Sequence, residues 1–219
     1  MKDIVLFDLD GTLLDSVPTI GRCCNAALKE NGLPENPVPD YNRKVGRGML
    51  RLIEQAVPAG TSKEKIDAVM ASYDRIYTEA CHTPGHIYPG VPDMLRELAA
   101  RGIGTAVLSN KPENQCRVMH DSTFQGLVDV MWGHREGYPH KPDPALALEL
   151  VSMMDGRLIA YVGDSEVDLA LAKNLGVPAV GVTWGTRTRE ELLAADPDCT
   201  VCDTAGELEE ALLTFARAE

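Results

Sequence analysis

The chain has 219 residues, of which 33 are acidic and 21 are Lys or Arg, giving a formal net charge of −12. With 44% hydrophobic and 25% charged residues, its composition is typical of a folded globular protein and excludes a disordered or collagen-like chain. The negative charge argues against binding to nucleic acid, and a site for a phosphorylated substrate would have to supply local positive charge.

The first residues and the cysteines indicate a cytoplasmic protein. Ile4–Phe7 is apolar but is followed at once by acidic residues, unlike a secretory signal peptide. No apolar run reaches the roughly 18 residues that cross a bilayer, so we expect no membrane association. Without a secretion signal, the six cysteines are expected to be reduced thiols. The Cys199-x-x-Cys202 spacing lacks a second pair, and we interpret it as structural.

The first predicted element is a strand, and a helical block follows it. Ile4–Leu9 is a run of strand-forming apolar residues that ends at an Asp-Gly turn. From about Asp15 to Tyr88 the pattern is almost wholly helical. Helices are predicted at Pro18–Asn31, Met49–Val57 and Ser62–His82. We therefore expect a helical insert after the first strand.

Beyond the insert, strands and helices alternate. Strands are predicted at Ile103–Ser109, Leu127–Trp132, Leu158–Gly163 and Ala179–Thr183, with a short one at Thr200-Val201. Helices are predicted at Val91–Arg101, Asp143–Met154 and Glu166–Leu175. Buried strands joined by helices predict an α/β fold, a parallel sheet with right-handed crossovers.

Polar residues lie next to several of these strands, where parallel sheets carry functional sites. They are Asp8, Asp10 and Thr12 after the first strand, Ser109, Asn110 and Lys111 after the second, Lys141 before the fourth, and Asp164 and Asp168 after it. Each alone is explained as a turn, a helix cap or a surface residue. Together they would crowd carboxylates at one edge, which is costly unless a cation compensates them. Mg²⁺ prefers such oxygen ligands.

The same residues form four motifs that occur in a fixed order. They are Phe7–Ser16, Ser109-Asn110-Lys111, Lys141–Pro144 and Gly163–Asp168. This set resembles the haloacid dehalogenase superfamily over nearly the whole chain, and the long first gap matches the place of the family's helical cap. The resemblance implies a Rossmann-like core over residues 1–14 and 86–219, with a small helical cap domain over residues 15–85.

The resemblance also implies a Mg²⁺-dependent phosphomonoester hydrolase that works through an aspartyl-phosphate. Asp8 would attack phosphorus, and Asp10 would act first as general acid and then as general base. Because a halide leaving group needs no acid, Asp10 argues against a dehalogenase. By resemblance, the remaining roles are Mg²⁺ ligands (Asp8, the backbone carbonyl of Asp10, Asp164), phosphoryl binding (Ser109, Lys141), assistance in substrate binding (Thr12, Asn110) and orientation of water or of Lys141 (Asp168).

The substrate is less constrained than the chemistry. The basic segment Arg43–Arg51 and the Val-Gly-x-Gly element within it resemble the phosphoglycolate phosphatases of this family. We hypothesise that Arg47 pairs with a carboxylate on a small phosphorylated acid; the alternative is a solvated helix end. The segment Gly133–Gly137 departs from that branch, and His134 and Arg135 are interpreted as rim residues.

Three functions stay open from the sequence. The first is a phosphatase for a small phosphorylated metabolite, and the second is a sugar-phosphate mutase or a pyrophosphatase of the same superfamily. The third is a non-catalytic module that binds metal or phosphate, against which the complete set of Asp8, Asp10, Lys141 and Asp164 argues. Fold alone does not fix the function. A monomer and a homodimer are both compatible with the sequence.

Overall fold

Six short, mostly apolar segments form one parallel sheet in the computed structural model, which describes residues 2–217. The strands are β1 (Lys2–Phe7), β4 (Gly104–Pro112), β5 (Val130–His134), β6 (Gly156–Gly163), β7 (Ala179–Val182) and β8 (Thr200–Cys202). Their order across the sheet is β5-β4-β1-β6-β7-β8. The α/β fold with a parallel sheet, predicted from the sequence, is confirmed.

The centre of the sheet is β1, which pairs with β4 on one side and with β6 on the other. Its residues Ile4–Phe7 are completely buried, because helices cover both faces. The chain builds one half of the sheet outward from β1 through β4 and β5, then returns to build the other half from β6. In sheets with such a reversal, ligands bind beyond the carboxyl ends of the strands next to it, which here are β1 and β6.

Helices cover the two faces of the sheet in separate groups. On one face α4 (Val91–Ala100), α5 (Glu113–Thr123) and α9 (Ala205–Arg217) pack against apolar side chains that include Val5 and Phe7. On the other, α6 (Ala145–Met153) and α7 (Glu166–Leu175) pack against Leu6. The short α8 (Arg189–Ala195) contacts β7 and β8 near the sheet edge. Among the described residues, no helix is both long and apolar enough to span a membrane.

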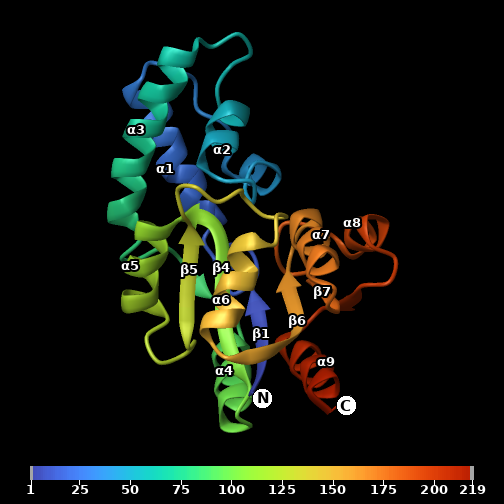
Figure 1. Ribbon diagram of the computed structural model, residues 1–219. Helices are drawn as coiled ribbons and strands as arrows, with labels where there is room; N and C mark the ends of the chain where they lie inside the picture. Colours follow the sequence, from blue (N-terminus) through green and yellow to red (C-terminus); the bar gives the residue numbers. More distant parts are fainter. Residues whose placement is uncertain (1, 218–219) are drawn as a thin grey trace.

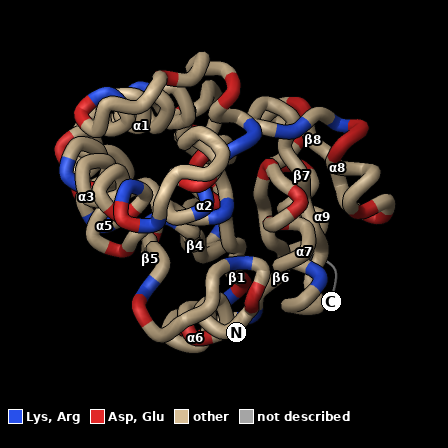
Figure 2. Tube along the Cα trace, turned by 90° about the horizontal axis from the view of Figure 1, so that it is seen from above, with Lys and Arg blue, Asp and Glu red and all other residues tan. Residues whose placement is uncertain are grey.

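A helical insert lies beyond the carboxyl ends of the strands, as Figure 1 shows. It comprises α1 (Val17–Glu30), the 3₁₀ helix η1 (Val38–Arg43), α2 (Met49–Ala56) and α3 (Lys63–Ala80). Viewed from above, α1, α2 and α3 lie to one side, over β4 and β5, while α7 and α8 lie opposite (Figure 2). The insert therefore covers the carboxyl ends of β4 and β5.

A two-stranded antiparallel ribbon carries the chain into the insert and back. It pairs β2 (Leu14–Asp15) with β3 (His86–Ile87). Beside it, Gly85 has a φ of +145°, and a Cβ there would lie 2.1 Å from the backbone oxygen of Asp15. Only glycine allows the outgoing and returning chains to approach so closely.

The insert has its own apolar contacts and a buried polar network. The helices α1 and α3 pack along each other, and the rings of Tyr73 and Tyr77 on α3 stack with centroids 5.3 Å apart. The buried Tyr41 hydroxyl donates a hydrogen bond of 2.7 Å to Asn25 Oδ1. Asn25 in turn accepts from the backbone N–H of Asn36 at 2.9 Å. These hydrogen bonds fix the irregular segment between α1 and α2 against α1.

Candidate active site

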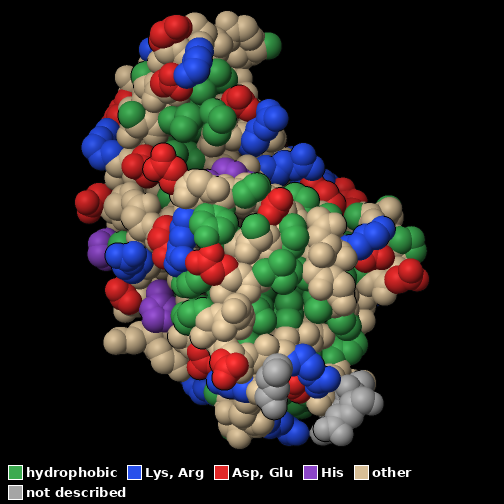
Figure 3. Space-filling model, viewed as in Figure 1, with side chains coloured by type: hydrophobic (Ala, Val, Ile, Leu, Met, Phe, Trp, Pro, Cys, Tyr) green, Lys and Arg blue, Asp and Glu red, His purple; other side chains and the backbone are tan. Residues whose placement is uncertain are grey.

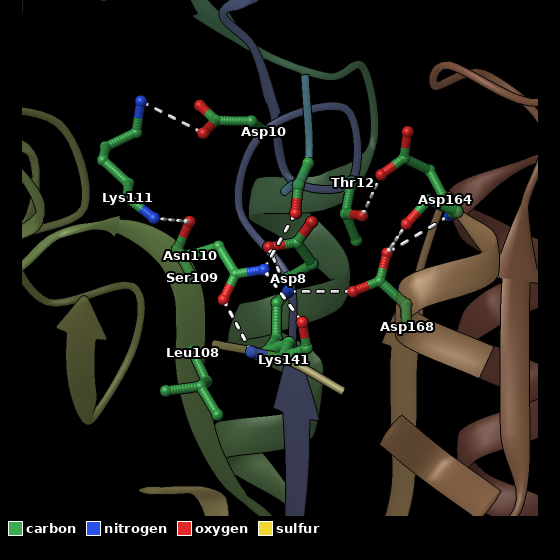
Figure 4. Close-up of polar contacts among 12 residues, drawn as sticks. Asp8, Asp10, Thr12, Leu108, Ser109, Asn110, Lys111, Lys141, Asp164 and Asp168 are labelled. Carbon is green, nitrogen blue, oxygen red and sulfur yellow. Dashed lines mark hydrogen bonds and ion pairs between the residues drawn. The ribbon is translucent and has the colours of Figure 1, made fainter. Parts of the chain in front are cut away.

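Asp8 lies directly after β1 and at the centre of a buried cluster of charged side chains (Figure 4). Its backbone N–H continues the sheet ladder with a 2.8 Å hydrogen bond to the carbonyl of Val162 on β6. The chain then turns, because the carbonyl of Leu9 accepts hydrogen bonds from the N–H groups of Thr12, Leu13 and Leu14. This turn separates Asp8 from Asp10 and directs their side chains to different partners.

Lys141 compensates the charge of Asp8. Its Nζ lies 2.8 Å from Asp8 Oδ1 and 2.8 Å from Asp168 Oδ1, and it donates to the Tyr161 hydroxyl at 2.9 Å. Burial opposes a charge on Lys141, but Asp168 and Asp8 outweigh it, so the pKa of the lysine lies well above its usual range. Burial raises the pKa of the Asp8 carboxyl, although Lys141 acts against this. The lysine is therefore the local positive charge that an acidic protein needs for a phosphate site.

Asp164 reaches the same cluster from the end of β6. Its Oδ1 accepts from the Thr12 hydroxyl at 3.1 Å, and its Oδ2 accepts from the Thr186 N–H at 2.7 Å and hydroxyl at 2.6 Å. Gly11, with a φ of +87°, passes so close that a Cβ would lie 2.4 Å from Asp164 Oδ2. Burial and the neighbouring Asp168 raise the pKa of Asp164 to about 6 despite these hydrogen bonds.

Asp168 sits in the first turn of α7 behind the other carboxylates. Its Oδ2 accepts from the backbone N–H of Ser165 at 3.2 Å as one half of a capping box at the start of the helix, and it also accepts from the Ser165 hydroxyl at 2.6 Å. Its Oδ1 contacts Lys141. Asp168 therefore holds the ammonium group of Lys141 next to Asp8.

Three buried carboxylates are grouped closely enough to hold a cation. Oxygen atoms of Asp8, Asp164 and Asp168 all lie within 4.8 Å of one another. An all-oxygen, anionic donor set suits a hard cation such as Mg²⁺. The side chain of Asp10 is not part of this cluster. That its backbone carbonyl contributes to a metal site stays a prediction.

The side chain of Asp10 faces the insert. Its Oδ1 accepts a 2.5 Å hydrogen bond from the Ser16 hydroxyl, and its Oδ2 forms a 3.0 Å ion pair with Lys111 Nζ. Lys111 also donates to the Tyr77 hydroxyl at 2.8 Å. The motifs predicted no role for Lys111. The available signal was its place within the second motif, directly after Ser109 and Asn110.

Asn110 connects the core to the insert. Its Oδ1 accepts a 2.8 Å hydrogen bond from the backbone N–H of Lys141, and its Nδ2 donates to the carbonyl of Gly46 at 2.9 Å. Ser109, one residue earlier, is buried and accepts from the N–H of Lys111 at 3.2 Å. The residues that the sequence predicted at Asp8, Ser109, Asn110 and Lys141 are thus brought together by three separate segments.

A pocket that is partly open to solvent lies between this cluster and the insert. The core contributes Asp8, Asp10, Ser109, Asn110, Lys111, Pro112 and Gln115, and the insert contributes Ile20, Val45, Gly46, Gly48, Met49, Leu52 and Tyr73. One wall is therefore polar and the opposite wall mostly apolar. A small polar molecule would be enclosed between them.

Arg47 lies outside that pocket, in a second groove between α2 and α7. Its guanidinium pairs with Glu166 Oε1 at 3.0 Å, and Arg187 donates to Glu166 Oε2 at 2.9 Å and to the insert carbonyl of Asn42 at 2.9 Å. Burial works against a charge on Glu166, yet hydrogen bonds from Arg187 and Arg47 bring its pKa down to about 2. Figure 3 shows basic side chains gathered beside acidic ones where the insert meets the core. The hypothesis that Arg47 binds a substrate carboxylate stays a prediction.

The segment Gly133–Gly137, whose sequence departs from the phosphoglycolate phosphatase pattern, contacts neighbouring side chains of the core. His134 stacks on His140 with ring centroids 3.7 Å apart, and Arg135 lies 3.6 Å over the Trp132 ring and pairs with Glu113 at 3.1 Å. These contacts hold the loop after β5 against the start of α5.

We expect Asp164→Asn to stabilise the metal-free protein at neutral pH. The folded-state pKa of Asp164, about 6, lies above the ordinary value of 3.8, so the folded state holds this proton more tightly than the unfolded state. As pH rises through this window, wild-type stability falls by about 3 kcal/mol in order of magnitude, because 1 pKa unit corresponds to about 1.4 kcal/mol. Asparagine has no charge to bury and keeps a similar shape.

Urea unfolding in EDTA between pH 3 and 8 measures this effect. The free energy of unfolding of the variant should exceed that of the wild type above pH 6, and the difference between the two should vanish below pH 4. The control is Asp93→Asn on α4, whose side chain is 87% exposed. A wild type that is the more stable protein above pH 6 would contradict the prediction.

The motifs and the fold identify the family. The model of the haloacid dehalogenase-like hydrolases matches residues 5–182, and the chain belongs to this family. The resemblance inferred from the four motifs is therefore confirmed. The chain is 33% identical over 208 residues to a phosphoglycolate phosphatase of Pseudomonas putida (strain KT2440), covering 91% of this chain and 76% of that protein. It is 32% identical over 227 residues to a phosphoglycolate phosphatase of Vibrio vulnificus, covering 97% of each.

A solved structure agrees with this assignment. The crystal structure of a predicted phosphoglycolate phosphatase from Haemophilus somnus superposes with a TM-score of 0.83 at 26% identity. The superposition covers 96% of this chain and 98% of that one, so it includes the insert as well as the core.

Proposed function

We propose that this chain is a Mg²⁺-dependent phosphatase that hydrolyses a small phosphomonoester through an aspartyl-phosphate on Asp8. The observation that carries the proposal is the presence of two carboxylates in one pocket: Asp8, buried and held by Lys141, and Asp10, 10% exposed, which faces the insert. Membership of a hydrolase family and two relatives named phosphoglycolate phosphatase support the same reaction class.

In the first step, a carboxylate oxygen of Asp8 attacks phosphorus while the bond from phosphorus to the alcohol oxygen breaks. The carboxyl group of Asp10 gives its proton to the departing alkoxide. In the second step, Asp10 takes a proton from water, which attacks phosphorus and releases phosphate from Asp8. Lys141 and Ser109 stabilise the phosphoryl oxygens through both steps.

The carboxylates of Asp8 and Asp164, with the backbone carbonyl of Asp10, would hold Mg²⁺. The donor set fits, because the three clustered carboxylates offer only oxygen atoms and carry more negative charge than Lys141 compensates. When bound, the ion neutralises charge on the carboxylates and on the transferred phosphoryl group. Asp168 orients Lys141, and Thr12 fixes Asp164 through its hydroxyl.

The insert would act as a cap domain over residues 15–85, joined to the core by the β2–β3 ribbon. Its apolar side chains form the wall of the pocket opposite Asp8 and Asp10. Closure of such a wall excludes bulk water, so that the covalent intermediate meets water only at the place that Asp10 can reach. The enclosed space suits a small phosphorylated metabolite rather than a polymer.

Phosphate release from a panel of phosphate esters tests the proposed function. The panel comprises 2-phosphoglycolate, sugar phosphates, nucleotides and pyrophosphate, each with Mg²⁺ and with EDTA. We expect release from at least one small monoester in Mg²⁺ and none in EDTA. Interconversion of sugar phosphates without release would indicate a mutase, and release from pyrophosphate alone a pyrophosphatase. Folded protein that releases phosphate from nothing in the panel would contradict the proposal.

A further inference from the structure

Lys111 is a buried cation that the phosphoryl chemistry above does not use. Its side chain is only 4% exposed, and it lines the pocket together with Asp8 and Asp10. Among the described residues that line this pocket, it is the only Lys or Arg. A charge is expensive to bury, so its presence here calls for an anionic partner.

Asp10 is one such partner, but it does not use the whole capacity of the ammonium group. Lys111 Nζ lies 3.0 Å from Asp10 Oδ2 and 2.8 Å from the Tyr77 hydroxyl, with the Tyr77 ring centroid 4.3 Å away. An ammonium group has three donors, and these two contacts account for two of them. The pocket lies against the same side chain.

The position of Lys111 relative to Asp8 and Asp10 indicates which part of the substrate it would contact. Ser109 and Lys111 lie two residues apart in the irregular end of β4, where the Lys111 N–H donates to the Ser109 hydroxyl at 3.2 Å, and both residues line the pocket. Ser109 belongs with Asp8 at the phosphoryl end, whereas Lys111 contacts Asp10, the proposed acid for the leaving group. A group on the leaving alcohol, beyond the ester oxygen, would therefore reach Lys111.

The rest of the pocket narrows the class of that alcohol. Opposite Lys111 the insert presents the apolar side chains of Ile20, Val45, Met49 and Leu52. A short carbon chain fits such a wall, and its anionic end would turn toward the only cationic lining side chain. Arg47 differs from Lys111, because its side chain is 58% exposed and paired with Glu166 in another groove.

From this placement we propose that Lys111 determines substrate specificity by binding a carboxylate on the alcohol portion of a small phosphomonoester. This inference rests on the proposed phosphatase function and names its substrate class, phosphorylated short hydroxy acids. When that carboxylate binds, the ammonium group of Lys111 would contact both it and Asp10, or it would exchange Asp10 for it. In the second case the side chain of Asp10 is free to approach the ester oxygen. A charge-assisted hydrogen bond in a buried site corresponds to a preference of roughly 10- to 100-fold over an uncharged analogue.

Two substrates that differ at one end test the proposal. The specificity constants kcat/KM are measured for 2-phosphoglycolate and for 2-hydroxyethyl phosphate, which replaces the carboxylate by an uncharged hydroxymethyl group. We expect the wild type to prefer 2-phosphoglycolate at least 10-fold. Lys111→Gln should remove most of this preference, and Lys111→Arg should restore part of it. Lys63→Gln, at an exposed lysine that lines neither this pocket nor the outer groove, should leave the ratio between the two substrates as it is.

Each other outcome overturns the proposal. A wild type with equal kcat/KM for both substrates has no carboxylate site. An equal loss on both substrates in Lys111→Gln would show that the lysine serves only to position Asp10. A ratio altered by Arg47→Gln but not by Lys111→Gln would move the carboxylate to the outer groove.

Calorimetric binding to Asp8→Asn separates this proposal from the proposed function, since it needs no turnover. We expect this protein to bind 2-phosphoglycolate at least 10-fold more tightly than 2-hydroxyethyl phosphate, and Asp8→Asn with Lys111→Gln to lose the difference. Equal affinities would overturn the carboxylate site even if the wild type is an active phosphatase. Selective binding by Asp8→Asn, together with a wild type that turns over no substrate, would overturn the proposed function alone.

Discussion

Replacing Lys141 with methionine is expected to destabilise the metal-free protein by about 3–5 kcal/mol and to abolish turnover. The ammonium group lies 2.8 Å from both Asp8 and Asp168, and its side chain is only 4% exposed. Methionine has a similar length but no charge, so the variant would bury two carboxylates without their cation. For a chain of this size, such a loss corresponds to a fall in Tm of roughly 6–20 °C.

Urea unfolding in EDTA measures the loss, and two further variants make it specific. Lys63→Met removes an exposed lysine that pairs with Asp67 at 2.7 Å, and it should leave the unfolding midpoint unchanged. Adding Asp8→Asn to Lys141→Met removes one of the uncompensated charges, so the double variant should recover part of the stability. A single variant within about 1 kcal/mol of the wild type would show that the ion pairs contribute little.

Replacing Asp8 with asparagine is expected to lower kcat by about 10⁴-fold or more while the protein stays folded. Asparagine keeps the shape of the side chain and can still accept a hydrogen bond from Lys141, but its amide is no nucleophile toward phosphorus. Because the covalent intermediate forms on this residue in the proposed mechanism, the variant lacks the group that attacks phosphorus.

Phosphate release under saturating substrate measures kcat, and circular dichroism confirms that the variant is folded. Asp129→Asn, at an exposed aspartate that pairs with Lys2, is the matched control and should retain full activity. Activity of Asp8→Asn within tenfold of the wild type would indicate direct attack by water on phosphorus. Trapping of phosphate on the wild type but not on the variant would support the covalent step independently.

Much of the core could be predicted from the sequence, because its strands are short apolar runs bounded by turn residues. The prediction placed Ile4–Leu9 and Leu158–Gly163 close to β1 and β6. The predicted third strand begins at Leu127, three residues before β5, because Leu127 is apolar. In the structure the N–H of Leu127 instead donates to the carbonyl of Phe124 and closes a turn. Periodicity alone does not distinguish an apolar turn residue from a strand residue.

Three helices were not predicted, and the sequences of two of them explain why. The segment Glu113–Thr123, which forms α5, is rich in polar residues and buries only Gln115, Cys116 and Met119. The helix α8 has only seven residues. Such segments become helical because the sheet beneath them offers a surface to cover, which is information held in the tertiary structure. The third, α9 at the end of the chain, received no prediction.

In the candidate site, too, some features could be predicted from the sequence and others depend on tertiary contacts. Its residues could be predicted because the motifs follow the strands that converge at one edge, and the structure gathers Asp8, Lys141, Asp164 and Asp168 there. Their catalytic roles stay predictions. The ion pair of Lys111 with Asp10 joins residues 101 positions apart in sequence, and that of Arg47 with Glu166 joins residues 119 apart. No spacing rule within a single sequence predicts such partners.

The junction between insert and core has a consequence for how the molecule responds to its medium. It is formed in part by surface ion pairs, Arg47 with Glu166 and Arg43 with Glu191, each worth at most about 1 kcal/mol. Dissolved ions screen such pairs over a Debye length of about 8–10 Å. Added salt therefore weakens the contact between the insert and the core, whereas it hardly affects the buried charges around Asp8 and Lys141. Ionic strength thus acts on the residence time of ligands separately from the chemistry, so product release should quicken with salt before catalysis itself changes.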